Sequence, residues 1–222
     1  MSSRNEILAS LRRGLRRGAA SEAQQEAVRQ RLQHHPRTLI PARGQQPGEA
    51  RVELFIRMAR EAAAEVVVLA SIEQLPAAVA QTLASEGERE LVVADDERLA
   101  ALDWNTPDGP IRCHRRVARV GDRASLTPAF AGIAETGTLL LYSRPESPTS
   151  LNFLPDTHLV LLRREDLVGV YEEGWDRLRA VCGERLPRSV NLITGPSRSA
   201  DIEQKLQLGA HGPRRLVIYL VG

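Results

Sequence analysis

The chain has 222 residues, which is enough for one sizeable hydrophobic core or for one domain with an additional arm. Its composition, 42% hydrophobic and 26% charged, is that of a globular protein, and a net charge of +2 is too small to indicate a nucleic-acid partner. The charge is unevenly distributed, because residues 1–43 contain nine arginines and three glutamates and therefore carry +6, which leaves −4 on the remainder.

The cysteine content and the hydropathy indicate which cofactors the chain can hold and in which cellular compartment it is expected. Cys113 and Cys182 lie far apart, and neither has a CxxC partner. Two isolated thiols provide neither a disulfide framework nor the ligands of a zinc or iron–sulfur site, so we expect no metal or cofactor in this chain. No apolar run reaches the roughly 20 residues of a membrane-spanning helix. Arginines after Leu11 interrupt the N-terminal apolar positions, unlike a signal peptide, so we expect a reduced, cytoplasmic protein.

The N-terminal segment has the pattern of a helical arm. Residues 3–17 predict a basic amphipathic helix, which can dock on protein or on an anionic membrane surface; the short apolar stripe without aromatic residues favours protein. Residues 21–35 predict a second, polar helix. Residues 36–48 contain three prolines and two glycines and therefore predict a linker. We accordingly divide the chain into an arm with its linker, residues 1–48, and a domain over residues 49–222.

Helical and strand patterns alternate from residue 50 onward. Helices are expected over residues 51–64, 71–85 (with Ser71 and Gln74 as a capping box), 99–102, 125–134 and 165–182. Strands are expected over residues 66–70, 90–94, 111–120, 139–142, 158–162, 190–193 and 216–221, and most of these are continuously apolar, as buried parallel strands are. The pattern predicts a three-layer, Rossmann-like α/β sandwich with a mainly parallel sheet, in which ligands bind beyond the C-terminal ends of the strands.

The stretch from Val190 to Gly212 has the pattern of a binding site. A strand is followed by the turn at Gly195, by Ser197-Arg198-Ser199, and by an expected helix that carries Asp201 and Glu203 in its first turn and ends at Gly209; His211-Gly212 then leads into the last strand. Free N–H groups at a helix start attract anions, and a guanidinium is a bidentate donor for carboxylate or phosphate. The alternative is purely structural, with Ser197 or Ser199 as an N-cap.

A second candidate site is Glu135-Thr136-Gly137-Thr138, which precedes an apolar strand. Glycine permits close backbone approach, and the threonines provide hydroxyl groups. Burial of Glu135 at the head of a core strand would raise the pKa of its carboxyl and make it a usable acid or base, although it can equally be an exposed connector. Further along the chain, His158 begins a predicted strand, and a lone histidine at such a position is usually structural.

Two blocks of sequence together resemble a known family. AGIAETGTLLL (131–141) and LITGPSRSADIEQKLQLGAHGPRRLVIYLV (192–221) resemble the signature of the LUD domain, and more narrowly that of the lactate-utilisation protein C (LutC/YkgG) family. The intervening SLNFLPDTHLVLL (150–162) and the basic N-terminal helix fit the same family. The resemblance implies a fold similar to the sugar-phosphate isomerase and CoA-transferase (NagB/RpiA/CoA transferase-like) superfamily.

The resemblance also implies a function and a set of site residues. Members of the family act with two iron–sulfur subunits in oxidising L-lactate to pyruvate, which implies a subunit without a redox centre of its own, a small carboxylate ligand, and iron–sulfur clusters in the partners. The alternatives are a stand-alone isomerase or acyl/CoA-transferase-like enzyme, or a structural or regulatory module. Glu135 is the candidate catalytic residue, and the candidate ligand-binding residues are Thr136, Gly137, Thr138, Gly195, Ser197, Arg198, Ser199, Asp201, Glu203, His211 and Gly212.

Overall fold

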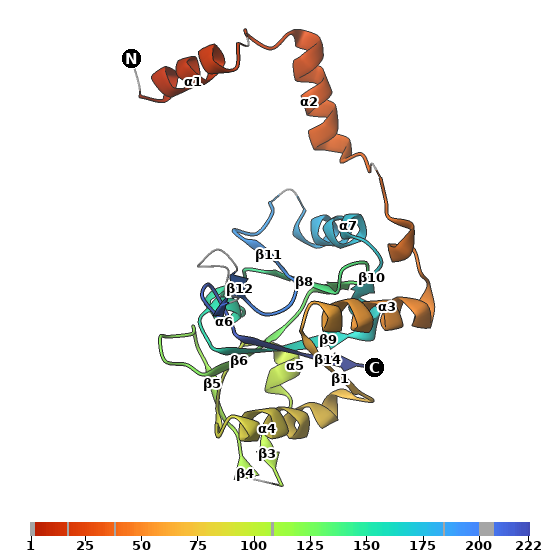
Figure 1. Ribbon diagram of the computed structural model, residues 1–222, viewed down its shortest axis with the longest axis vertical. Coiled ribbons are helices and arrows are strands. Elements are labelled where there is room, and N and C mark those ends of the chain that lie inside the picture. The colour runs from red at the N-terminus through yellow and green to blue at the C-terminus, as the bar shows by residue number, and fades with distance from the viewer. Residues whose placement is uncertain (1–2, 17, 38, 108, 184, 200–206) are drawn as a thin grey trace. The chain divides into compact units, whose positions relative to one another are not determined.

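Six parallel strands form the central sheet of the computed structural model, which describes residues 3–16, 18–37, 39–107, 109–183, 185–199 and 207–222 (Figure 1). Their spatial order is β1-β14-β9-β6-β2-β5, and every neighbouring pair is parallel. The bounds are β1 (Glu65–Leu69), β14 (Arg215–Val221), β9 (Thr157–Arg163), β6 (Ala124–Pro128), β2 (Glu90–Val93) and β5 (Arg112–Arg115).

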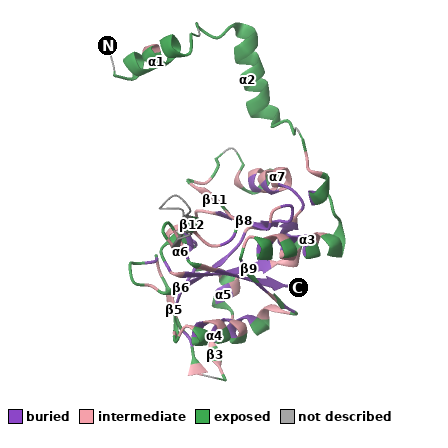
Figure 2. Ribbon diagram, in the orientation of Figure 1, coloured by how far each residue is buried: buried purple, intermediate pink, exposed green. Residues whose placement is uncertain are grey.

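The continuous apolar runs of the inner strands follow from burial on both faces of this sheet. In β9, Leu159 and Leu161 belong to one hydrophobic cluster, whereas the alternate residues Val160 and Leu162 belong to the other. The same alternation holds along β14. Because side chains of a strand point to opposite faces in turn, a strand covered on both faces must be apolar throughout. Figure 2 shows these strands as the buried centre of the domain.

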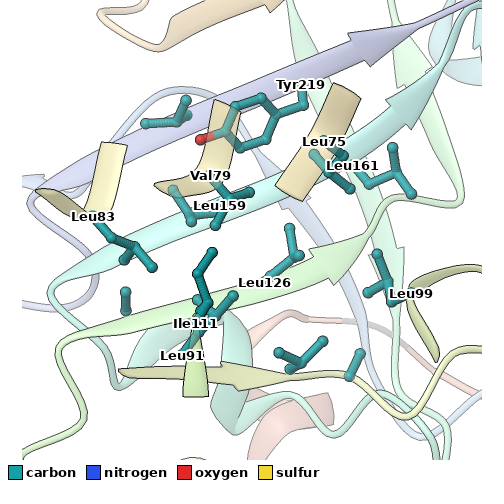
Figure 3. Packing of buried hydrophobic residues seen from close by; sticks show 14 of the residues in the cluster. Leu75, Val79, Leu83, Leu91, Leu99, Ile111, Leu126, Leu159, Leu161 and Tyr219 are labelled. Atoms are coloured by element: carbon teal, nitrogen blue, oxygen red, sulfur yellow. The ribbon is translucent and has the colours of Figure 1, made fainter. Parts of the chain in front are cut away.

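One face of the central sheet is covered by α4 (Leu75–Ser85), which follows the short 3-10 helix η2 (Ile72–Gln74), and by α5 (Glu97–Ala100). Figure 3 shows Leu75, Val79 and Leu83 of α4 packed over the leucines of β9 and β6. Tyr219 of β14 is buried in this layer, and its hydroxyl lies 2.7 Å from the Oγ1 of Thr82. The tyrosine thus adds a large apolar surface to the core while its polar atom keeps a partner.

The opposite face is covered by α3 (Gly48–Glu61) and by a second, smaller sheet. The order of this sheet is β10-β7-β8-β11, with the β10–β7 pair parallel and the other two pairs antiparallel. The bounds are β10 (Leu167–Val168), β7 (Ala131–Ile133), β8 (Thr138–Tyr142) and β11 (Val190–Ile193). Leu139 and Leu141 of β8 face the central sheet, and α7 (Tyr171–Cys182) packs on β7 and β10.

The remaining elements are short. They are η1 (Ala42–Gly44), the paired strands β3 (Asn105–Thr106) and β4 (Gly109–Pro110), α6 (Ser150–Phe153), η3 (Arg164–Asp166), and the paired strands β12 (Arg198–Ser199) and β13 (Gln207–Leu208).

The N-terminal helices form a unit of their own. The chain divides into residues 1–39 and residues 40–222. The first unit contains α1 (Ser3–Gly14) and α2 (Glu22–His34), and neither helix has a buried residue. Ser21 and Gln24 form a capping box at the start of α2, which satisfies two backbone donors that would otherwise lack partners. The stability of this unit therefore comes from local helix-forming interactions and not from a core.

The structure confirms the α/β class with a mainly parallel central sheet and corrects several predicted elements. The predicted helix over residues 125–134 is wrong, because β6 and β7 occupy this stretch as buried strands. Its small apolar residues have no clear period, and Pro128 is unsuited to the interior of a helix. The predicted helix over residues 165–182 begins only at Tyr171, because η3 and β10 precede it.

Two further predicted details are also wrong. The side chain of Ser71 makes no capping hydrogen bond to the following helix; instead the Oε1 of Gln74 accepts from the amide of Ala70 at 2.9 Å. The predicted helix that ends at Gly209 is wrong at its C-terminal end, because Gln207–Leu208 pairs with Arg198–Ser199 as antiparallel strands. Its predicted first turn, with Asp201 and Glu203, lies outside the described residues.

Gly137 makes the tight turn between β7 and β8 possible. Its φ of +65° lies in the left-handed region, which residues with a Cβ rarely adopt. A Cβ at this position would also collide with the backbone of Met58 and Ala59 in α3. The second predicted motif is therefore packed directly against a helix of the core.

We expect Gly137→Ala to lower the free energy of unfolding by at least about 3 kcal/mol, because it combines backbone strain with a steric collision. Gly87→Ala is the matched control: its φ is +71° but nothing lies within 4 Å of the new Cβ, so only the strain of about 1 kcal/mol should appear. Denaturant titration of both variants measures the difference. Equal losses would show that the contact with α3 contributes nothing.

Candidate functional site

The two predicted motif blocks meet at a cluster of hydroxyl groups. Because β8 and β11 are antiparallel, the start of β8 lies beside the end of β11. The Oγ1 atoms of Thr138 and Thr194 are 2.6 Å apart, and those of Thr136 and Thr138 are 2.7 Å apart. The hydroxyl of Tyr171 lies 2.9 Å from Thr138 Oγ1 and 3.0 Å from Thr136 Oγ1. Thr136 and Thr138 are thus joined to the loop that follows β11.

A pocket of about 280 Å³ adjoins this cluster at Thr194. The loop after β11 and the loop before β14 form its walls, together with the first residues of β9 and β14 and with α6. We call it the loop pocket; it is lined by Asn152, Phe153, His158, Leu192, Ile193, Thr194, Gly195, Pro196, Ser197, Arg198, His211, Gly212, Pro213 and Leu216. Five of the predicted ligand-binding residues therefore line one pocket, namely Gly195, Ser197, Arg198, His211 and Gly212.

The loop pocket does not lie at the C-terminal edge of the central sheet, where the sequence pattern places a ligand. The strand before the Gly195 turn is β11, which belongs to the mixed second sheet, and His158 and Leu216 stand near the N-terminal ends of β9 and β14. The expected rule for parallel sheets thus does not apply to this loop.

Ser197 joins the two loops of the pocket. Its amide donates to the carbonyl of Pro213 at 2.8 Å, and its carbonyl accepts from the amide of Gly209 at 3.0 Å. Its Oγ accepts from the amide of His211 at 3.3 Å. One serine therefore fixes the positions of Gly212 and His211 relative to Gly195, and its hydroxyl is partly engaged in the scaffold.

Arg198 has a structural contact in addition to its place in the pocket. Its guanidinium donates to the carbonyl of Ala62, the C-cap residue of α3, although the side chain is exposed. A cation at a helix C-terminus interacts favourably with the helix dipole and with carbonyls that lack helical partners. Gly195, with φ +73°, packs against the same carbonyl. The end of α3 thus holds the turn in place.

Two buried residues of the loop pocket were not predicted as ligand-binding. His158 is fully buried, and its Nε2 lies 2.7 Å from the Oγ1 of Thr127, while its Nδ1 has no hydrogen-bond partner. Burial lowers the pKa of His158 to about 3, so the imidazole is neutral. In the neutral ring Nδ1 accepts or donates a hydrogen bond according to the tautomer, because the hydroxyl of Thr127 can serve Nε2 in either role.

Asn152 provides a second polar atom without a partner. Its side chain is buried, its Nδ2 donates to the Oδ1 of Asn191 at 3.4 Å, and its Oδ1 has no partner. Buried polar atoms are nearly always hydrogen-bonded, because leaving one unpaired costs about 1–3 kcal/mol. Two such polar atoms on one pocket favour a ligand or water molecule that hydrogen-bonds to both of them, with a donor directed at the Oδ1 of Asn152. Both residues lie in the SLNFLPDTHLVLL block, which was the only sequence signal that could have identified them.

Glu135 lies outside the lining of the loop pocket. Its side chain is buried, with 6% exposure, and its amide donates to the carbonyl of Gly169 at 3.0 Å. Its Cβ packs against Gly44 of η1. Burial, followed by the charge of Glu172, raises the pKa of the Glu135 carboxyl, and the charge of Arg43 opposes this shift. Its Oε2 has no partner. The structure thus separates the candidate acid or base from Arg198.

The other predicted site residues are placed as follows. Gly137 packs on α3, and the backbone of Ser199 is in β12, whereas Asp201 and Glu203 lie outside the described residues. Within the described ranges, no three His, Cys, Asp or Glu side chains gather as a metal site. No helix in that part of the chain combines the length and hydrophobicity needed to cross a membrane.

We expect Glu135→Gln to raise the free energy of unfolding at pH 7 by about 1 kcal/mol, because it removes a buried carboxylate that lacks a full set of partners. The raised pKa of Glu135 means that the unfolded chain loses this proton first, so the folded state is penalised as pH rises above the ordinary value of 4.5. Thermal unfolding at pH 5 and pH 8 measures the effect, which should be larger at pH 8. A destabilised variant would contradict this account.

His158 should make the protein less stable in acid. Since its pKa is about 3 when folded and 6.5 ordinarily, the unfolded chain binds the proton first as pH falls through this window. Between pH 7 and pH 5, this one group should lower the free energy of unfolding by about 2 kcal/mol. Denaturant titrations at both pH values should show a smaller drop in His158→Gln. In the control His211→Gln, at an exposed histidine, the drop should equal that of the wild type.

Comparisons with known proteins identify the family. Residues 52–221 match the model of the LUD domain. Lactate utilization protein C from Macrococcus caseolyticus is 31% identical over 152 residues, which cover 64% of this chain and 66% of that protein. A protein of Neisseria meningitidis serogroup B is 45% identical over 103 residues, which cover 44% of this chain and 42% of that protein. The chain thus spans less than two thirds of the length of these two relatives.

A solved structure shows the same fold. The crystal structure of a DUF162 family protein from Deinococcus radiodurans superimposes with a TM-score of 0.61 at 24% identity, covering 80% of this chain and 100% of that one. The match to the domain model covers most of the chain and includes both motif blocks. The resemblance noted in the sequence is therefore confirmed, and this chain belongs to the LUD domain family.

Proposed function

We propose that this chain acts in lactate utilisation, as a subunit without a redox centre of its own, and that its loop pocket binds lactate, pyruvate or a related small carboxylate. The name of the Macrococcus caseolyticus relative and the LUD domain match support the pathway. One observation supports the binding site: Arg198, His211 and Gly212 share a small pocket with two buried polar atoms that lack partners, His158 Nδ1 and Asn152 Oδ1.

The groups in the loop pocket match the two ends of a hydroxy acid. The hydroxyl of lactate has one proton to donate, and the unpartnered Oδ1 of Asn152 would accept it. The hydroxyl oxygen would in turn accept from Nδ1 of His158 in the tautomer that carries the ring proton there. The carboxylate is an acceptor, and the guanidinium of Arg198 would hold it by charge-assisted hydrogen bonds. A pocket of about 280 Å³ suits a ligand of this small size.

The oxidation itself needs an electron acceptor. Conversion of lactate to pyruvate releases two electrons and two protons. We place the acceptors in two partner subunits with iron–sulfur clusters, as the family resemblance of the sequence implies. We place the system in the cytoplasm, as the cysteine content and hydropathy of the sequence suggest. In this arrangement the present chain binds and positions the carboxylate, and the partners accept the electrons.

The proposal predicts that Arg198→Gln and Asn152→Ala each reduce lactate-dependent dye reduction to about a tenth or less, the equivalent of losing one charge-assisted hydrogen bond. The measurement uses extract of a host strain that lacks this protein, supplemented with purified wild type or variant. Arg214→Gln is the matched control, because this exposed arginine pairs with Asp156 and does not line the loop pocket. It should restore activity fully.

Thermal unfolding must accompany the activity assay, because Arg198 also holds the end of α3. Full restoration by folded Arg198→Gln and Asn152→Ala would show that the loop pocket has no role in the reaction. If the wild type also fails to restore activity, the assignment to lactate utilisation is wrong. Turnover of a sugar phosphate or CoA ester by the purified chain alone would instead support an isomerase or acyl-transferase.

A further inference from the structure

The C-terminal edge of the central sheet contains a topological switch point. β2 and β6 are neighbours in the sheet, with Val92 opposite Ser125. From β2 the chain proceeds outward to β5, at the edge, whereas from β6 it proceeds the other way to β9. The segments that follow the two strands lie on opposite faces, since α5 packs in one core layer and β7 and β8 lie in the other. Ligand sites of α/β proteins form at such a point.

A second pocket, of about 210 Å³, lies at this position. Pro128, Ala129 and Phe130, which end or follow β6, form part of its wall. Four arginines from four different elements surround it, so we call it the arginine pocket. They are Arg98 of α5, Arg144 after β8, Arg163 at the end of β9 and Arg177 of α7.

Two aspartates hold the four guanidinium groups in place. Asp96 accepts from the Nε and Nη2 of Arg98 at 2.8 and 2.9 Å and from Arg144 at 3.1 Å. Asp166, which is buried, accepts from Arg163 at 3.1 Å and from Arg177. Burial alone would raise the pKa of Asp96, but the hydrogen bonds and charges of Arg98 and Arg144 hold it below its ordinary value. Both aspartates are therefore anchors for the arginines.

The charge of the arginine pocket is not balanced by these anchors. Four guanidinium groups face two carboxylates, which leaves two positive charges. Glu165 pairs with Arg163 at 2.7 Å from the rim, where it is 67% exposed, and counting it leaves a formal excess of one positive charge. The four arginine side chains keep between 30% and 41% of their surface exposed, so they remain accessible to a ligand.

Aromatic rings fix the orientation of two of the arginines. The Cζ of Arg177 lies 5.2 Å from the ring centre of Phe130, and that of Arg144 lies 5.5 Å from the ring centre of Tyr142. The two rings contact each other edge to face, with centres 5.2 Å apart. Stacking on an aromatic face costs a guanidinium little of its capacity for hydrogen bonds in its own plane. The arginines are thus positioned before any ligand arrives.

We propose that the arginine pocket is a second binding site, for a small molecule with a doubly negative headgroup, either a phosphate monoester or a dicarboxylate. A dianion offers several acceptor oxygens and two charges to the four guanidinium groups, whereas a monocarboxylate such as lactate offers two oxygens and one charge. The site is separate from the loop pocket: His158 and Arg163 lie five positions apart on β9, which corresponds to roughly 16 Å. The inference does not depend on the proposed function.

Titration calorimetry of the full chain tests this site, with inorganic phosphate and malonate as dianionic probes and lactate as the monoanionic probe. We expect a dianion to bind and Arg144→Gln/Arg177→Gln to weaken that binding by about tenfold or more. The matched control, Arg123→Gln/Arg214→Gln, removes the same charge from two exposed arginines that pair with Asp156, at the opposite end of the sheet. Its affinity should stay within about twofold of the wild type. Tighter binding of phosphate than of malonate would indicate a phosphate monoester as the ligand, and the reverse would indicate a dicarboxylate.

Three results would overturn the proposal. The first is that neither dianion binds the wild type more tightly than about 10 mM. The second is an equal loss of affinity in both double variants, which would indicate general surface charge. The third is that lactate binds at this pocket as tightly as the dianions. If the double variant unfolds, the single change Arg144→Gln gives the same test, because Asp96 keeps both bonds to Arg98.

Discussion

The last turn of α3 is the support on which both motif loops depend. Gly137 packs against the backbone of Met58 and Ala59, and Gly195 packs against the carbonyl of Ala62. Both glycines have positive φ, so their loops reach the helix through conformations that other residues avoid. The hydrogen bond between Thr138 and Thr194 then joins the two loops to each other. A helix that lines neither pocket thus determines where the motif residues stand.

The α/β class and most strands of the central sheet could be predicted from the sequence, because the patterns that indicate them are local. Continuous apolar runs identified β2, β9 and β14, since strands buried on both faces leave no polar alternation. The apolar run of β1 identified it as well, although β1 is at the edge of the sheet and Val68 is exposed. β6 and β7 were missed because their small residues are equally compatible with a buried helix. The second sheet was missed for a different reason. It forms only through pairing of β7, β8 and β11, which are distant in sequence or too short to have a period.

The candidate sites were likewise predictable only where a local sequence pattern marks them. The loop pocket could be anticipated from the Gly195–Ser199 turn. The SLNFLPDTHLVLL block marks the segment that holds Asn152 and His158, but it does not show which of their atoms lack partners after folding. The burial of Glu135 away from Arg198 is likewise a tertiary fact. The arginine pocket had no sequence signal at all: its four arginines come from four elements with no regular spacing, in a chain that contains 30 basic residues.

Strand β9 has a consequence for how the two pockets relate. It pairs with β14 on one side and β6 on the other, and a shift of one residue would exchange Leu159 and Val160 between the two core layers. Such a slip would disrupt both hydrophobic clusters at once, so the register of β9 is fixed. His158 lies near one end of this strand and Arg163 at the other. The separation of the pockets is therefore set by covalent chain length. Any communication between them must pass through the surrounding loops or through charge, and not through sliding of the sheet.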